Sequence, residues 1–187
     1  DNGRVTRVVM DHQKPEFFTC ATPDQIVRLA KGLGLVPDAI LDTGWPVQVV
    51  SSGIRQLFIP VRSLAEVQAL SPKQQDTAAM SRICAELDPD THCHECLMVL
   101  TLETTEPGVN VHTRMFAPGM GIGEDPATGS ASGGLGAYLI ENGILPATPP
   151  TTHLIAEQGI EIARPSRISI EIDGARTHHR RGVAVVD

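Results

Sequence analysis

The stretch RMFAPGMGIGEDPATGSASGGLG, residues 114–136, decides the fold. A strand is predicted to end near its beginning, a glycine-rich turn follows, and a helix is predicted from about Gly129 to Glu141. The first half of this helix is built of small residues, and its glycines at 133, 134 and 136 cost about 1 kcal/mol each relative to alanine. We expect such a helix only where another element packs very close to its axis, as a curled sheet wrapped around it would.

The start of this helix is a candidate site for an anionic ligand. The first turn of a helix presents unpaired backbone N–H groups and the positive end of the helix dipole. Gly129 has no side chain, so a carboxylate could approach the backbone closely, and Ser130 adds a hydroxyl. Asp125 places a carboxylate beside the same point, and Thr128 directly precedes the helix. The alternative is an ordinary N-capped, buried helix without a ligand, because acidic caps are common.

Two familiar phosphate-binding patterns fit this segment less well. A Walker A loop ends in Gly-Lys-Ser or Gly-Lys-Thr, and residues 114–136 contain no lysine. Gly119, Gly121 and Gly123 alternate, but they do not form the GxGxxG pattern of a dinucleotide site.

The composition of the whole chain narrows its class. A chain of 187 residues allows one domain or one and a half, and its 17 glycines and 14 prolines favour short strands and turns over a helical bundle. A net charge of −7 and few aromatic residues argue against nucleic acid as a partner. No apolar stretch approaches roughly 18 residues, so no membrane span is expected. Four cysteines are too few for a disulfide scaffold, which predicts a reducing, cytoplasmic setting.

Strands and helices are predicted to mix along the chain. Thr22 and Gly34 mark the beginning and end of one helix, and two shorter helical pieces are expected between Ser63 and Leu87. Without strict strand–helix alternation, the pattern favours an α+β fold. Strands are expected near residues 5–10, 47–50, 57–61, 96–102, 109–116, 160–162, 168–172 and 183–186.

The motif GIGEDPATGSASG at 121–133, preceded by RMFAP, resembles the signature of the phenazine-biosynthesis PhzF-like family of isomerases. MDHQKPEF at 10–17, VVSSGIRQLFIPV at 49–61 and EQGIEIARPS at 157–166 follow the order that this family shows. The resemblance therefore spans nearly the whole chain. It departs at Ala163, where the family more often has glycine.

This resemblance implies the diaminopimelate-epimerase fold, in which two lobes each wrap a curled mixed sheet around a central helix and the active site lies between them. It also implies proton transfer on a small carboxylate-bearing substrate without cofactor or metal, often in a homodimer. Matched by position, Asp125 and Ser130 are the catalytic candidates. The substrate-binding candidates are Thr128, Gly129, Ser52 and Gly53. The helix start has no cysteine, which disfavours thiol-based racemisation.

By the same resemblance, residues 1–21 are a remnant of the N-terminal lobe and residues 22–187 form the C-terminal lobe, whose last strand can return to the other lobe. The family's acid/base glutamate and its partner histidine match no residue of this chain. Two hypotheses therefore stand. One is an isomerase or epimerase of a small amino, hydroxy or dihydroaromatic acid, such as a dihydro-hydroxyanthranilate. The other is a non-catalytic carboxylate-binding or regulatory lobe.

Other groups of polar residues are weaker candidates for a functional site. Cys93 and Cys96, with His92 nearby, could suggest a metal or redox site, but a structural zinc site needs a second pair at comparable spacing. A polar turn with a buried Cys96 is the preferred interpretation. His112 is interpreted as an ordinary polar-face histidine, and the basic run at 176–181 as a solvated turn.

Overall fold

The structure is a computed structural model that describes residues 10–174 and 182–186. The basic run at 176–181 and most of the first expected strand lie outside the described residues. The described strands are β1 Met10–Asp11, β2 Glu16–Cys20, β3 Gln48–Ser51, β4 Arg55–Pro60, β5 Leu97–Thr101, β6 Val111–Ala117, β7 Ile122–Asp125, β8 Thr151–Gln158, β9 Ser166–Asp173 and β10 Gly182–Val186.

These strands form one mixed sheet in the order β1-β10-β9-β8-β6-β5-β4-β3-β2, and β7 pairs with β6 beside this path. The β4–β5 and β6–β8 pairs are parallel, whereas the others are antiparallel. The described helices are α1 Pro23–Leu33, α2 Asp38–Leu41, α3 Leu64–Gln68, α4 Thr77–Leu87 and α5 Gly129–Glu141. None of these helices is long and apolar enough to cross a membrane.

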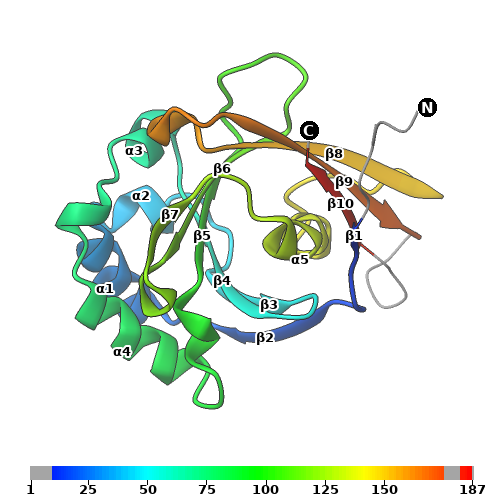
Figure 1. Ribbon diagram of the computed structural model, residues 1–187. Helices are drawn as coiled ribbons and strands as arrows, with labels where there is room; N and C mark the ends of the chain where they lie inside the picture. Colours follow the sequence, from blue (N-terminus) through cyan, green and yellow to red (C-terminus); the bar gives the residue numbers. More distant parts are fainter. Residues whose placement is uncertain (1–9, 175–181, 187) are drawn as a thin grey trace.

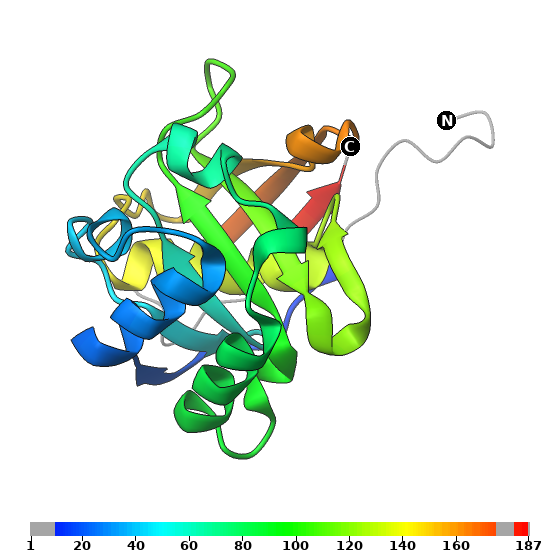
Figure 2. The same cartoon turned by 90° about the vertical axis from the view of Figure 1, so that its left-hand side faces the viewer.

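The sheet curls around α5, with α1 to α4 on its other side (Figure 1; Figure 2). A Cβ atom at Gly136 would come within 2.7 Å of Ile170, and one at Gly134 within 3.2 Å of Phe58. The glycines of α5 therefore allow strands on opposite sides of the helix to approach its backbone. The predicted α+β fold, with a curled sheet around a small-residue helix, is confirmed.

Strands β3, β4 and β5 are buried on both faces. Val50, Phe58 and Met98 belong to the core around α5, whereas their neighbours Val49, Leu57 and Leu97 belong to the core under α1 and α4. Successive side chains of a strand point to opposite faces, so these strands separate the two cores.

The predicted limits of α1 are also confirmed. Thr22 and Gln25 form a reciprocal capping box at its beginning, and Gly34 ends it with φ +83°. The two expected helical pieces after Ser63 are α3 and α4.

The strand expected at 160–162 is wrong. Ile160–Ile162 form a short 3-10 helix, η4, between Gly159 at φ +79° and Ala163 at φ +56°. Ala163 thus has a left-handed backbone conformation, which explains why glycine suits this position. The strand in this region is β8. Its buried positions include the polar residues Thr152 and Gln158, so the sequence does not show the alternation of apolar and polar residues that predicts a strand.

The expected division at residue 21 stays a prediction. β2 pairs with β3 at one end of the sheet, and β1 pairs with β10, which also pairs with β9. Strands β1 and β2, which lie within residues 10–21, are therefore both part of the sheet around α5.

Candidate active site

The loop between β7 and α5 brings Asp125 and Thr128 together. Thr128 Oγ1 donates a hydrogen bond to Asp125 Oδ2 at 2.6 Å, and no side chain caps the helix start. The capped helix that the sequence also allowed is therefore not what forms. The backbone N–H groups of the first turn of α5 lack partners within the helix and are left for another acceptor.

Gln158 fixes this loop from the end of β8. Its Nε2 donates to the carbonyl oxygen of Asp125 at 2.7 Å and to Thr128 Oγ1 at 2.9 Å, while its Oε1 lies 3.3 Å from the Thr128 amide nitrogen that donates to it. The side chain is fully buried. The amide of Gln158 therefore holds both the carboxylate-bearing residue and the residue before the helix.

Gly159 lets β8 approach the same loop. A Cβ atom there would lie 2.7 Å from the carbonyl oxygen of Pro126, and its φ of +79° is one that side-chain-bearing residues rarely adopt. Neither Gln158 nor Gly159 was a sequence candidate. The available signal was their place in the family-like motif EQGIEIARPS.

Ser52, in the turn between β3 and β4, reaches the first turn of α5. Its Oγ lies 3.5 Å from the carbonyl oxygen of Ser130, to which it can donate. Gly53 is exposed, and its N–H donates to Ser51 Oγ at 3.1 Å. Ser52 therefore lies close to the start of α5, as predicted. Gly53 makes no hydrogen bond to α5 within the described residues.

Gly129 faces β1 across a short gap. A Cβ atom at Gly129 would lie 3.4 Å from the terminal methyl group of Met10, whose side chain is half exposed. The space beside Gly129 is thus bordered by a flexible apolar side chain rather than by backbone.

His12 is a further residue of this region that sequence reasoning missed. A Cβ atom at Gly133 would come within 2.5 Å of the imidazole ring, and Nδ1 lies 3.1 Å from Ser52 Oγ. Burial lowers the pKa of His12, although a hydrogen bond with the Ser52 backbone and the charge of Asp11 oppose the shift. The lowered pKa favours the neutral imidazole near pH 7.

His112 shares a polar strand face with Arg114, as interpreted from the sequence, but this face is buried. It is fully buried, with Nδ1 2.8 Å from Glu157 Oε1 and Nε2 2.9 Å from Glu161 Oε1. Burial opposes the charged form, but the hydrogen bonds to Glu161 and Glu157 raise the pKa of His112. Beside it, Arg114 pairs with Glu124 through two hydrogen bonds of 2.8 and 2.7 Å. We call these five residues the ionic cluster.

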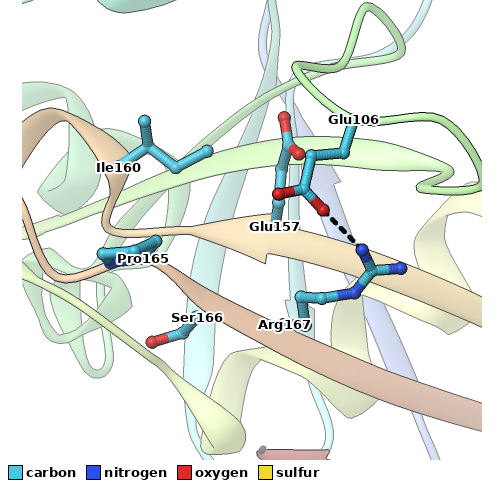
Figure 3. A pocket seen from close by; sticks show the side chains of 6 residues that line it. All are labelled: Glu106, Glu157, Ile160, Pro165, Ser166 and Arg167. Atoms are coloured by element: carbon cyan, nitrogen blue, oxygen red, sulfur yellow. Dashed lines mark hydrogen bonds and ion pairs between the residues drawn. The ribbon is translucent and has the colours of Figure 1, made fainter.

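A pocket of about 260 Å³ lies next to the ionic cluster (Figure 3). Arg167 in its wall pairs with Glu106 at 2.5 Å, and Glu157 accepts hydrogen bonds from Thr105 and lies within hydrogen-bond distance of His112. Its charged groups are thus already matched within the protein. The pocket is lined by Glu106, Glu157, Ile160, Pro165, Ser166 and Arg167.

The cysteine-containing turn offers no ligand set. Cys93 and Cys96 are free and buried, and burial raises the pKa of Cys96 to about 11. Cys96 Sγ lies 3.5 Å from the sulfur of Met120. The described residues contain no group of three His, Cys, Asp or Glu side chains placed to hold a metal ion.

Comparisons with known proteins agree with the fold. The family model described as phenazine biosynthesis-like protein, PhzC-PhzF, matches residues 1–186. A phenazine biosynthesis protein of the PhzF family from Bacillus anthracis superposes with a TM-score of 0.74 at 24% identity, over 96% of this chain and 56% of that one. A predicted epimerase from Pseudomonas aeruginosa gives 0.63 at 25% identity, over 98% and 58%.

Curated relatives are similar in sequence to about nine tenths of this chain. An uncharacterized isomerase of Deinococcus radiodurans is 34% identical over 173 residues, which are 91% of this chain and 51% of that protein. The trans-2,3-dihydro-3-hydroxyanthranilate isomerase of Pseudomonas chlororaphis is 31% identical over 173 residues, 92% of this chain and 52% of that protein. The chain spans about half the length of the curated relatives it matches.

Proposed function

Because this chain belongs to the phenazine biosynthesis-like protein family, we propose that the protein containing it is a cofactor-independent isomerase or epimerase of a small carboxylate-bearing acid. The reaction is acid–base transfer of a proton on carbon. Relatives named isomerases support this reaction class. A dihydro-hydroxyanthranilate-type acid or an amino acid is the proposed substrate, and a cytoplasmic homodimer is the proposed form.

The observation that carries the proposal is the uncapped start of α5 beside Asp125. Removing a proton from a carbon next to a carboxylate or enamine spreads negative charge over the substrate. Backbone N–H groups at a helix start stabilise such charge where it develops and need no reorganisation. Gly129 and Ser130 supply these amides, and the N-cap residue Thr128 makes no capping hydrogen bond that would compete with the ligand for them.

Asp125 is the proposed proton-carrying group of this half of the site. Thr128 and Gln158 fix its side chain and its backbone, so the carboxylate is held beside the helix start. A positioned acid or base contributes typically 100- to 10,000-fold to a proton transfer. A shift of one hydrogen between two carbons also requires that the proton be returned to carbon, by Asp125 itself or by a second acid.

Deuterium exchange tests the proposal. The complete gene product, incubated in D₂O with candidate amino, hydroxy and dihydroaromatic acids, should incorporate deuterium at a carbon position, read by mass spectrometry. Asp125→Asn should lower the incorporation at least 100-fold and leave the folded structure intact. The matched control is Asp173→Asn, because Asp173 also accepts a threonine hydrogen bond, from Thr151 at 2.7 Å, but lies at the exposed end of β9.

The second hypothesis predicts a different result. A non-catalytic lobe would bind carboxylates without any exchange, in the wild-type protein as in Asp125→Asn. Unchanged exchange in Asp125→Asn would remove Asp125 from its proposed role.

A further inference from the structure

The Nε2 atom of His12 is buried. The residue is 7% exposed, and its Nε2 has no hydrogen-bond partner among the described residues. Buried polar atoms in folded proteins are nearly always hydrogen-bonded, and an exception at a candidate site points to a group that the protein itself does not supply.

The surroundings of His12 fix its ring. Gly133 leaves room for the imidazole against α5, and the backbone N–H of Gln13 donates to the carbonyl oxygen of Ser52 at 3.2 Å. The segment after β1 is therefore held to the β3–β4 turn by two contacts with Ser52, and His12 packs against the second turn of α5. The ring atoms nearest to Gly133 are Cγ, Cδ2 and Nδ1, so Nε2 lies on the side of the ring away from the helix backbone.

The hydrogen-bond network assigns the tautomer of His12. The carbonyl oxygen of Ser130 can only accept, so both contacts of Ser52 Oγ are hydrogen bonds only when its hydroxyl proton is directed to this oxygen. The Ser52 oxygen is then free to accept from Nδ1–H of His12 at 3.1 Å. In this arrangement the neutral ring keeps a lone pair on Nε2, which makes that nitrogen a hydrogen-bond acceptor.

We infer that His12 is a specificity-determining residue of the proposed site, whose Nε2 accepts a hydrogen bond from an amino or hydroxyl group of the bound acid. The inference rests on the proposed function, because the carboxylate of the same ligand occupies the start of α5. Gly133 lies four residues beyond Gly129, about 6 Å along the helix. This separation is within the size of a small cyclic amino or hydroxy acid.

A matched pair of ligands tests this role. Anthranilate and benzoate share a ring and a carboxylate, and only anthranilate carries an amino donor. Isothermal titration of the complete gene product at pH 7 should show anthranilate binding about fivefold more tightly than benzoate, as expected for one added hydrogen bond. His12→Asn keeps a polar atom near the Nδ1 position and lacks Nε2, so it should remove the preference and leave benzoate binding unchanged.

The exposed His153 provides the control, since His153→Asn should keep the preference. A second measurement needs no variant. The His12 ring is identified through the contact of its Cδ2 proton with the Gly133 α protons. The ¹⁵N chemical shift of its Nε2 should be that of an unprotonated nitrogen and should move on addition of anthranilate but not of benzoate.

The outcomes separate the two proposals. Binding of both acids with a preference that persists in His12→Asn, or an Nε2 signal that does not respond to anthranilate, overturns the role of His12 and leaves the carboxylate site standing. Binding of neither acid overturns the carboxylate site itself and, with it, the inference. A water molecule as the sole partner of Nε2 would give the first of these results.

Discussion

The two faces of the curled sheet bury polar groups in different ways. On the outer face, His112 of β6 lies between the carboxylates of Glu157 and Glu161, and Arg114 of the same strand pairs with Glu124. Even Glu161 Oε2, which makes no hydrogen bond to a described residue, lies 3.8 Å from Arg114 Nε.

The inner face, around the start of α5, uses neutral groups instead. The amide of Gln158 donates to the backbone carbonyl oxygen of Asp125, and the imidazole of His12 packs against Gly133 of α5. The first-turn amides of α5 have no side-chain cap, and His12 Nε2 has no partner among the described residues.

This difference indicates that the outer face has a structural role, and it supports the proposed ligand site on the inner face. Charges that neutralise one another have little capacity left for a ligand, and removal of one of them leaves its partners buried and uncompensated. Groups with free donors or acceptors are poised for a molecule that the fold does not provide. The comparison therefore predicts large effects on stability from the outer face, and effects on ligand binding from the inner face.

The largest expected effect is that of His112→Leu. The substitution leaves Glu157 and Glu161 buried without their shared cation, which should lower the free energy of unfolding by about 3–5 kcal/mol. Urea denaturation measures the change. His153→Leu, at an exposed position, should change it by less than about 0.5 kcal/mol. A loss below about 1 kcal/mol in His112→Leu would show that the ionic cluster does not stabilise the fold in this way.

A smaller effect is expected for Gln158→Met. The methionine fills a similar volume but leaves the Thr128 amide and the Asp125 carbonyl oxygen without their partner, at a cost of about 1–3 kcal/mol. Unlike His112→Leu, it should also weaken benzoate binding at a temperature where the protein remains folded. Gln56→Met is the matched control, because Gln56 is buried in the same sheet but its Oε1 has no partner among the described residues. Equal benzoate affinity in Gln158→Met and wild type would contradict a positioning role.

The smallest expected effect is the pH dependence of stability. The carboxylates Glu161 and Glu157 raise the pKa of His112 above its ordinary value of 6.5. The stabilisation by the protonated ring is therefore present in full below pH 6.5 and is lost as pH rises through the higher pKa of the folded protein. The free energy of unfolding should decline between pH 6.5 and 8, below the range where cysteines of the unfolded chain ionise. His112→Leu should abolish this part of the decline, and an identical pH profile in both proteins would refute the assignment.

Much of the inner region could be predicted from local sequence. The limits of α5, the small residues along it and the positions of Asp125 and Thr128 follow from spacing within one short segment. The residues of this region that could not be predicted are far from it in the sequence. Gln158 is 30 residues from Thr128, and Ser52 is 40 residues from His12. Such contacts are decided by strand pairing and register, which local periodicity does not encode.

By itself, the sequence determined that a helix of small residues lies inside a curled sheet, because glycine and alanine at those positions make sense only where strands approach the helix axis. It also determined that the start of this helix is a candidate anion site. Only the tertiary structure decided that His112 is buried between two carboxylates, that Gln158 positions the loop and that His12 Nε2 has no partner in the described part of the chain. The physical reason is that the state of a buried polar group depends on which partners surround it, and the parallel pairing of β6 with β8 brings the partners of His112 from distant segments.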